Sequence, residues 1–162
     1  MLNTFTVAFF GHREIEYFQE TERALEKLIE SLMREHEYVE FLIGRNGEFD
    51  QLTASTVRSG RNRLGFLNSS LTLVLPYMTA EFRDNEESFL AYYDEVEVSA
   101  AADGVHFKSA MQTRNREMVD RSDLVVFCVD HTSGGAYQTL KYAKRCQKPY
   151  INISEKGTGL GL

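Results

Sequence analysis

The sequence predicts a single α/β domain, a doubly wound and mainly parallel sheet of about five to seven strands with helices on both faces. Short runs that are apolar along their whole length recur along the chain, as is typical of parallel strands covered on both faces. Segments with helical periodicity lie between these runs, so strands and helices alternate. At 162 residues the chain has the length of one domain, which we expect to span residues 1–162.

Five apolar runs rich in β-branched or aromatic residues are predicted strands. They are FTVAFF at 5–10, VEFLIG at 39–44, LTLVLPY at 71–77, DLVVFCVD at 123–130 and PYINI at 149–153. The acidic stretch 79–104 is less regular. Within it we expect a short helix in EESFLAYY and a short or edge strand in DEVEV.

The clearest helix is predicted over FQETERALEKLIESLMREHE. Its apolar side chains form a single stripe, while charged residues fill the opposite side, and this stripe is expected to contact the core. The stripe consists of Leu25, Leu28, Ile29, Leu32 and Met33. Further helices are expected at about 50–61, 107–120 and 135–145, and the glycine-rich tail at 155–162 is expected to be frayed and flexible.

The overall composition is that of an ordinary globular protein, with 43% hydrophobic and 26% charged residues. The formal net charge is −6, so no global basic field attracts a phosphate backbone, and we do not expect nucleic acid as a partner. No apolar run approaches the roughly 20 residues of a membrane helix, and the first residues do not read as a secretory signal. We therefore expect a cytoplasmic protein, whose apolar helix faces are compatible with a monomer or a homo-oligomer.

The spacing of cysteines and histidines along the chain does not indicate a metal site or a disulfide. Cys128 and Cys146 are too far apart for a metal cluster and are interpreted as reduced thiols. His36, His106 and His131 show no metal-ligand spacing. We expect no metal and no required cofactor.

Loops that follow the predicted strands are the candidate binding sites, because ligands in such sheets bind at the carboxyl ends of the strands. After the fourth strand, Gly134 and Gly135 could present backbone N–H groups to a phosphate at a helix N-terminus, with hydroxyls from Ser133 and Thr139. The alternative is that these residues only cap and turn the chain. No dinucleotide fingerprint or P-loop is present.

The loop GRNGEFDQLTA follows the second strand and offers glycines and carboxylates. Gly44 and Gly47 permit unusual backbone conformations, and Asp50 is expected to N-cap the helix. Glu48 could accept hydrogen bonds from a ribose or act as a nucleophile or general base. The alternative for Glu48 is an exposed loop carboxylate without a role.

Gly11, His12 and Arg13 follow the first strand. Arg13 could bind a phosphate with two hydrogen bonds, and His12 could donate a hydrogen bond or transfer a proton; the alternative is a simple turn. In MQTRNREM, Arg114 and Asn115 are expected near one end of a helix, where they could touch a ligand.

Six pieces of the chain together resemble the SLOG superfamily and are most similar to its YpsA-like branch of small bacterial proteins. They are TFTVAFFGHR, GEFDQLTASTV, LTLVLPY, YDEV, RNREMVDRSDLVVFCVD and SGGAYQTLKYAK. The resemblance extends from about Thr4 to Ile153 and implies a Rossmann-like fold with a pocket for a nucleotide or nucleotide-derived ligand. The residues that match the motifs of the family are Gly11, His12, Arg13, Gly47, Glu48, Asp50, Arg114, Asn115, Gly134, Gly135 and Thr139.

Two related groups within the superfamily suggest different chemistries. LONELY GUY enzymes remove the base from cytokinin nucleotides with an arginine and the glutamate of a PGGxGTxxE motif. Here Lys141 or Tyr142 stands at the position of that glutamate, and Asn115 replaces a lysine of their helix motif, whereas Arg114 is kept. The DNA-processing protein DprA uses a similar fold to hold single-stranded DNA.

These observations support three hypotheses, in decreasing order of preference. The first is a protein that binds a nucleotide or nucleotide-derived ligand at the carboxyl ends of the strands, in the manner of a sensor. The second is a nucleotide N-glycosidase of the phosphoribohydrolase type that uses Glu48. The third is a module that binds single-stranded nucleic acid or another protein.

Overall fold

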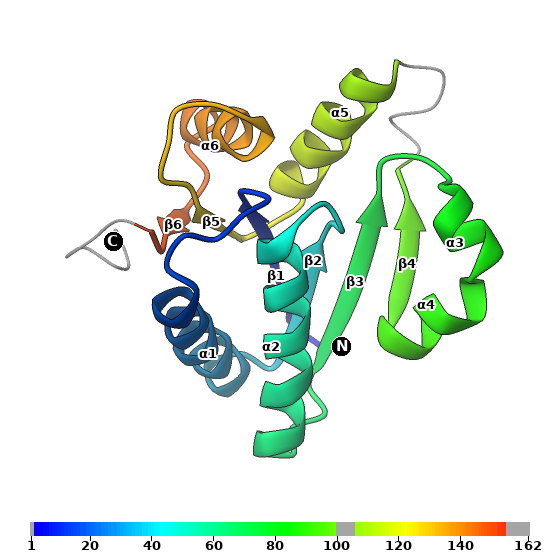
Figure 1. Ribbon diagram of the computed structural model, residues 1–162. Helices are drawn as coiled ribbons and strands as arrows, with labels where there is room; N and C mark the ends of the chain where they lie inside the picture. Colours follow the sequence, from blue (N-terminus) through cyan, green and yellow to red (C-terminus); the bar gives the residue numbers. More distant parts are fainter. Residues whose placement is uncertain (1, 100–105, 155–162) are drawn as a thin grey trace.

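The computed structural model describes residues 2–99 and 106–154 and contains one sheet of six parallel strands (Figure 1). The strands are β1 (Thr4–Gly11), β2 (Tyr38–Ile43), β3 (Ser69–Leu75), β4 (Glu95–Val98), β5 (Leu124–Cys128) and β6 (Tyr150–Asn152). The helices are α1 (Phe18–Glu35), α2 (Glu48–Leu64), α3 (Ala80–Asp84), α4 (Glu86–Tyr92), α5 (Phe107–Asp120) and α6 (Gly135–Arg145). The predicted doubly wound, Rossmann-like class is confirmed, while the predicted tail at 155–162 lies outside the described residues.

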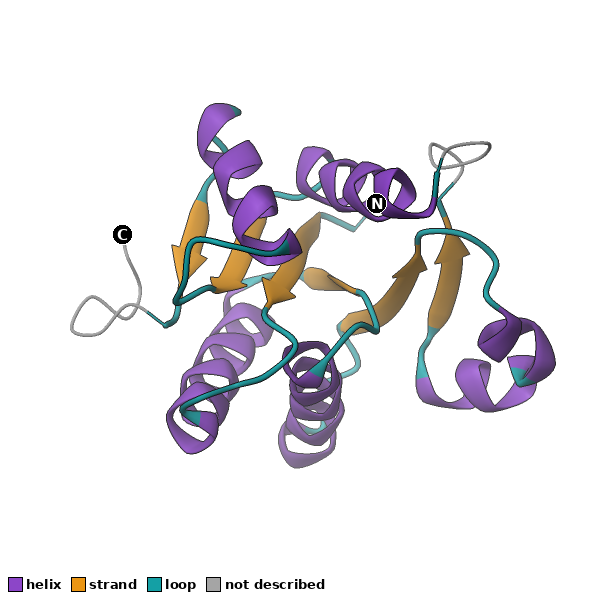
Figure 2. Ribbon diagram, turned by 45° about the horizontal axis from the view of Figure 1, so that its top comes forward, coloured by secondary structure: helices purple, strands orange, loops and turns teal. Residues whose placement is uncertain are grey.

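Helices cover both faces of the sheet, as Figure 2 shows. Successive residues of β1 point to opposite faces, in keeping with the two-residue period of a strand. Val7 and Phe9 pack in the cluster that includes α1 and α2, whereas Ala8 and Phe10 pack in the cluster that includes α5 and α6. The nearly continuous apolar character of β1 therefore results from burial on both sides.

The strand order β4-β3-β2-β1-β5-β6 reverses between β1 and β5. From β1 the chain adds β2, β3 and β4 on one side, and β5 and β6 then continue on the other side of β1. The last paired residues of β1 and β5 are Gly11 and Cys128, so both strands end at the same level of the sheet. The loops that leave these two strands diverge there, which is the position where open α/β sheets bind ligands.

Several element boundaries differ from the sequence-based expectation for local reasons. β3 ends at Leu75 rather than at 77, because Pro76 has no N–H for the ladder. The five-residue helix α3 was not predicted; it begins after Thr79, whose Oγ1 accepts a hydrogen bond from Phe82 N at 3.1 Å. The short helix and the edge strand expected in the acidic stretch are present as α4 and β4.

Helix α2 begins at Glu48, two residues before the expected start, and ends in a left-handed turn at Gly65. Gly65 has a φ of 67°, and its N–H donates to the carbonyl of Arg61 at 2.8 Å. No helix in the described part of the chain is both long and apolar enough to cross a bilayer.

Candidate ligand site at the switch point

A cavity of about 950 Å³ opens at the carboxyl edge of the sheet, where the strand order reverses. Its walls come from the loop after β1, the loop after β2, the inward side of α5 and the start of α6. The predicted site residues that line it are Gly11, His12, Arg13, Gly44, Asp50, Arg114, Asn115, Gly134 and Gly135. The fold therefore brings together loops that are separated along the chain by complete strands and helices.

Arg114 and Asn115, on α5, form what we call the floor of the cavity. Their residues are only 3% and 6% exposed, yet both line the cavity. The Nε of Arg114 donates to Asn115 Oδ1 at 2.9 Å, and its Nη1 donates to the carbonyl of Val74 at 2.7 Å. Among the described residues, Nη2 of Arg114 has no hydrogen-bond acceptor. The guanidinium is thus fixed at two nitrogens and keeps N–H donors for a ligand.

Thr139 lies behind the floor and is 1% exposed. Its Oγ1 accepts a hydrogen bond from Asn115 Nδ2 at 3.0 Å and donates to the carbonyl of Gly135 at 2.9 Å. The hydroxyl predicted to contact a phosphate is therefore engaged in joining α5 to α6. Thr139 positions the floor rather than lining the cavity.

Asp50 and Arg114 form an electrostatic pair in the lining of the cavity. The carboxylate of Asp50 is buried, which raises its pKa, while the N–H of Asn46 at 2.8 Å from Oδ2 and the charge of Arg114 oppose that shift. Burial likewise lowers the pKa of Arg114, and Asp50 opposes it. Gly44 separates them: a Cβ there would lie 3.0 Å from Arg114 Nη1 and 3.2 Å from Asp50 Oδ2.

The expectation that Asp50 N-caps α2 is wrong. Gly47 occupies the N-cap position, and Asp50 lies within the first turn, from which its carboxylate reaches back to the N–H of Asn46. This arrangement resembles the reciprocal half of a capping box, in which an acidic side chain of the first turn binds a preceding backbone N–H.

Glu48 lies at the start of α2 and is exposed. Its Oε1 accepts a hydrogen bond from Ile15 N at 3.2 Å, and its own N–H donates to the carbonyl of Arg13 at 2.8 Å. These bonds attach the loop after β1 to α2. Glu48 is not among the residues that line the cavity, so its catalytic role stays a prediction.

Two glycines allow the loop after β1 to pack against α2. A Cβ at Gly11 would lie 2.3 Å from the ring of Phe49, which is fully buried as expected. A Cβ at Gly47 would lie 2.5 Å from the Cα of Arg13. Close packing of the chain explains these glycines, and it places His12 and Arg13 beside the cavity.

Helix α6 begins at the cavity without a side-chain cap. Gly134 precedes it with a φ of 90°, a conformation that glycine adopts readily. The first bond of the helix runs from Gln138 N to the carbonyl of Gly134. In the described structure, the N–H groups of Gly135, Ala136 and Tyr137 have no acceptor, which leaves three donors and the positive end of the helix dipole at this edge. Ser133 does not cap the helix; its Oγ lies 3.0 Å from His131 Nδ1.

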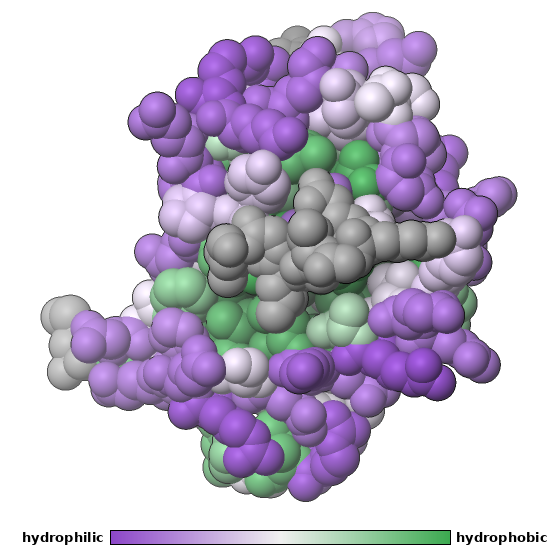
Figure 3. All heavy atoms as spheres, turned by 90° about the vertical axis from the view of Figure 1, so that its left-hand side faces the viewer, coloured by the Kyte–Doolittle hydropathy of each residue, from purple (hydrophilic) through white to green (hydrophobic). Residues whose placement is uncertain are grey.

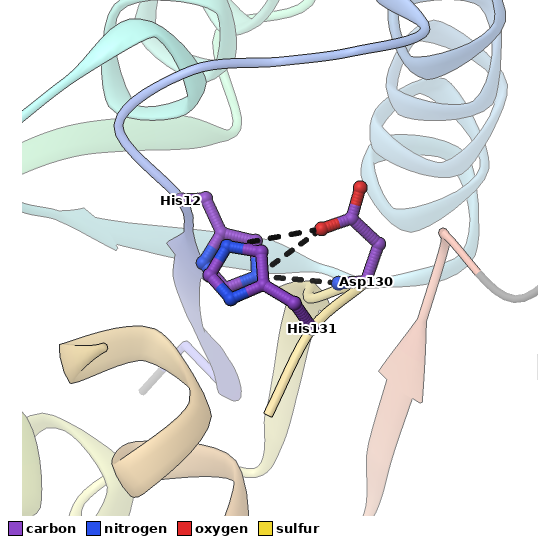
Figure 4. Close-up of side chains that lie close together, drawn as sticks. All are labelled: His12, Asp130 and His131. Atoms are coloured by element: carbon purple, nitrogen blue, oxygen red, sulfur yellow. Dashed lines mark hydrogen bonds and ion pairs between the residues drawn. The ribbon is translucent and has the colours of Figure 1, made fainter. Parts of the chain in front are cut away.

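His12, Asp130 and His131 form what we call the rim, at the ends of β1 and β5 (Figure 4). The two imidazole rings stack with centroids 3.5 Å apart and planes 11° apart. The N–H of Asp130 donates to His12 Nε2 at 3.2 Å. Burial and the neighbouring His131 lower the pKa of His12, and Asp130 opposes that shift. The neutral form of His12 is therefore favoured.

The rim also borders a second cavity of about 830 Å³, on the side of β6. Figure 3 views the molecule from this side and shows apolar residues on this face, bordered by polar regions. Cys128 lines this cavity, and burial raises the pKa of its thiol to about 11. Cys128 is therefore a protonated thiol at neutral pH and a poor nucleophile.

Sequence reasoning missed several residues of the first cavity. Asp130 is the last residue of the strand predicted at 123–130 and His131 follows it directly, so the strand-end rule that selected His12 could also have selected them. Lys108 and Gln112 line the cavity from α5, but no local pattern distinguishes them from other polar helix residues.

Comparison with known proteins gives matches at the level of structure. No protein-family model matches the sequence, and no curated protein sequence matches it. DNA processing protein A from Helicobacter pylori, solved to study its single-stranded DNA binding mode, aligns with a TM-score of 0.64 at 15% identity over 91% of this chain. DNA processing protein A (DprA) from Streptococcus pneumoniae aligns with a TM-score of 0.67 at 15% identity over 98% of this chain.

The chain shares its fold with DprA. It spans 64% of the Helicobacter protein and 53% of the Streptococcus protein, so both are considerably longer. The similarity shows the Rossmann-like fold, whereas membership of the SLOG superfamily and of its YpsA-like branch stays a prediction.

The expectation that nucleic acid can be set aside as a partner is corrected by this comparison. It rested on the net charge of the whole chain, but a structural neighbour of the same fold binds single-stranded DNA. Binding depends on the local field of a cleft rather than on the total charge. Three basic residues of this chain, Arg13, Lys108 and Arg114, line the cavity although the net charge is −6. Four acidic residues line it as well: Glu14, Glu16, Asp50 and Asp130.

Proposed function

We propose that the chain binds a nucleotide or nucleotide-derived ligand in the cavity at the switch point, as a member of the YpsA-like branch of the SLOG superfamily. The observation that carries the proposal is the convergence of two kinds of phosphate donor at one cavity. Arg114 supplies a buried guanidinium with N–H groups left over, and the start of α6 supplies backbone N–H groups without acceptors.

The floor favours binding because its donors are already fixed before a ligand arrives. Arg114 is held by Val74 and Asn115, and Asn115 is held by Thr139. Little side-chain entropy remains to be lost on binding. The second cavity, beyond the rim, has Tyr137 and Leu140 in its lining. These apolar side chains could pack against the base of the nucleotide.

Titration calorimetry with nucleoside monophosphates, ADP-ribose and NAD tests this proposal. Gly135→Asp adds a negative charge at the proposed phosphate site and should weaken binding by at least about tenfold. The substitution suits the fold, because a Cβ at Gly135 has its nearest contact at 3.4 Å and acidic residues are favoured in the first turn of a helix.

Asn62→Asp is the matched control. Asn62 is exposed in the last turn of α2, at the end of that helix away from the cavity, so the same change in charge should leave affinity within about twofold. Equal affinities for the wild type and Gly135→Asp would place the phosphate elsewhere. An absence of binding across the whole panel would contradict the proposal itself.

Single-stranded nucleic acid is a second candidate ligand, favoured by the structural similarity to DprA. Fluorescence anisotropy with single-stranded DNA at low and moderate salt tests it, because backbone binding releases counterions and weakens as salt rises. Competition by the nucleotide that binds most tightly would indicate a shared site. No binding at low salt would contradict this candidate.

The N-glycosidase alternative depends on Glu48. Mass spectrometry of the panel after incubation with the protein would detect a released base. Release that disappears in Glu48→Gln would favour the enzyme, whereas retention of an intact nucleotide would favour binding alone.

A further inference from the structure

We propose that His12, Asp130 and His131 form a binding site for a divalent transition-metal cation, with Zn²⁺ as the occupant that best matches their ligand atoms. The spacing of histidines along the chain gives no sign of such a site. His12 and Asp130 are 118 positions apart and meet only because β1 and β5 are neighbours in the sheet.

His12 Nε2 is the first ligand atom of the proposed site. The backbone N–H of Asp130 donates to His12 Nε2 at 3.2 Å, and a backbone amide keeps its proton. The imidazole therefore carries no proton on Nε2, and a metal would take the place of the amide hydrogen on its lone pair. The same atom lies 3.4 Å from Asp130 Oδ1, so a nitrogen and an oxygen ligand atom are already close together.

The second imidazole provides a third ligand atom on the same side. His131 Nε2 lies 4.0 Å from Asp130 Oδ1, while its Nδ1 lies 3.0 Å from Ser133 Oγ. Ser133 is thus in position to accept a hydrogen bond from Nδ1, which leaves Nε2 free for a metal. The candidate ligand atoms of the three residues all lie within 4.8 Å of one another.

These separations suit a tetrahedral cation after two changes: His12 Nε2 must exchange the N–H of Asp130 for the metal, and His131 must turn. Zn–N and Zn–O bonds of about 2.0–2.2 Å place tetrahedral ligand atoms roughly 3.4 Å apart. His12 and Asp130 already have this spacing. The stacked rings point their lone pairs in parallel, so His131 must turn out of the stack, and its side chain is 53% exposed and has room to do so.

The charge of Asp130 is also available to a cation. Within the described part of the chain, the groups within 4 Å of its carboxylate that could carry a positive charge are the two imidazoles. The Glu40, Glu95 and Glu97 cluster differs, because Arg121 already pairs with Glu40 and Glu97. Of the two clusters, the rim is the one whose carboxylate has no arginine or lysine paired with it among the described residues.

The donor set defines the class of metal. Two imidazoles and one carboxylate suit Zn²⁺ and neighbouring transition metals, whereas Mg²⁺ and Ca²⁺ prefer oxygen ligands. Three protein ligands leave a further position open for water or a phosphate oxygen, and the rim lines both cavities. Metal binding at the rim does not require the proposed nucleotide function.

Equilibrium dialysis of the full chain against Zn²⁺, followed by measurement of bound metal, tests the proposal. Co²⁺ gives a second readout, because its visible absorption reports the coordination geometry and Zn²⁺ should displace it. We expect one tightly bound ion per wild-type chain. His131→Gln and Asp130→Asn should each weaken binding by at least about tenfold, and both positions are exposed enough that folding should be preserved.

His36→Gln is the control, since His36 is also a stacked histidine, on Phe5, but lies outside the cluster. It should bind metal like the wild type. Unfolding midpoints of the metal-free proteins confirm that each variant is folded. The proposal is overturned if the wild type binds no stoichiometric Zn²⁺, or if His131→Gln and Asp130→Asn bind it as tightly as His36→Gln does.

Discussion

Arg114 and Asn115 at the floor of the cavity form a continuous chain of hydrogen bonds with Thr139 behind them. In contrast, His12, Asp130 and His131 at the rim meet through stacked rings and a hydrogen bond from the N–H of Asp130 to His12 Nε2. The floor is almost completely buried. At the rim, the side chains of Asp130 and His131 are 41% and 53% exposed.

This difference shows which side chains are already fixed in the folded protein and which can still move when a ligand binds. The floor residues must be satisfied when the chain folds, because an unpaired polar group in that position costs free energy. Asp130 and His131 can turn toward a ligand at small cost because water already reaches them, whereas the His12 side chain is only 11% exposed. Substitutions at the floor should therefore change stability and binding together, while substitutions of Asp130 or His131 should change binding with little effect on stability.

The largest effect is expected for Arg114→Met. The carbonyl of Val74 and the side-chain oxygen of Asn115 would lose their hydrogen-bond donor, and Asp50 would lose its nearby cation. Together these losses should lower the free energy of unfolding by about 3–5 kcal/mol. Denaturant titration measures this cost. Arg114→Lys should recover only part of it, because an ammonium lacks the forked donors. A loss below about 1 kcal/mol for Arg114→Met would show that the floor is not the stabilising network described.

Gly11→Ala should be the next most damaging change. Its Cβ would lie 2.3 Å from the ring of Phe49, and such overpacking costs about 1–3 kcal/mol. Gly60→Ala is the comparison within α2, where the added Cβ has its nearest contact at 3.9 Å. That substitution should stabilise the protein by about 0.4–1 kcal/mol. Thermal or denaturant unfolding measures both changes in the free energy of unfolding. If the two substitutions change it in the same direction, the packing described at the start of α2 is contradicted.

Thr139→Val should have a smaller effect, of about 1–2 kcal/mol, because it removes the acceptor of Asn115 Nδ2 while keeping the shape of the side chain. Thr139→Ser keeps the hydroxyl and should restore most of the ligand affinity that Thr139→Val loses. If the two variants bind a nucleotide equally well, Asn115 does not depend on Thr139 for its position.

Glu48→Gln should have the smallest effect, within about 0.5 kcal/mol. The amide oxygen of glutamine can still accept from Ile15 N, and the exposed position carries no buried charge. Nucleotide affinity should also be unchanged. Loss of a measurable base-releasing activity in this variant would instead restore the enzymatic hypothesis.

The sequence predicted what depends on local pattern. The apolar runs located five strands, and the ranges predicted for α5 and α6 match the structure, because strand periodicity and helix boundaries are encoded in neighbouring residues. The strand-end rule also brought most of the cavity-lining residues into consideration.

The sequence could not predict which side chains a distant element would engage. No local pattern shows that the hydroxyl of Thr139 bonds Asn115, because only the packing of α5 brings the two together. Asp50 looked like an N-cap, but α2 starts earlier and its carboxylate is buried near Arg114. The pairing of His12 with Asp130 depends on strand order, which no local pattern specifies.

Amide NMR of ¹⁵N-labelled protein during titration with nucleoside 5′-monophosphates tests the central claim most directly. If the cavity at the switch point holds the phosphate, the largest shifts should occur at the N–H groups of Gly135, Ala136 and Tyr137, together with the Nε–H of Arg114. The amides at the opposite end of α6 should change little. Saturable shifts that leave Gly135, Ala136, Tyr137 and Arg114 unmoved would contradict the account, and so would the absence of any shift.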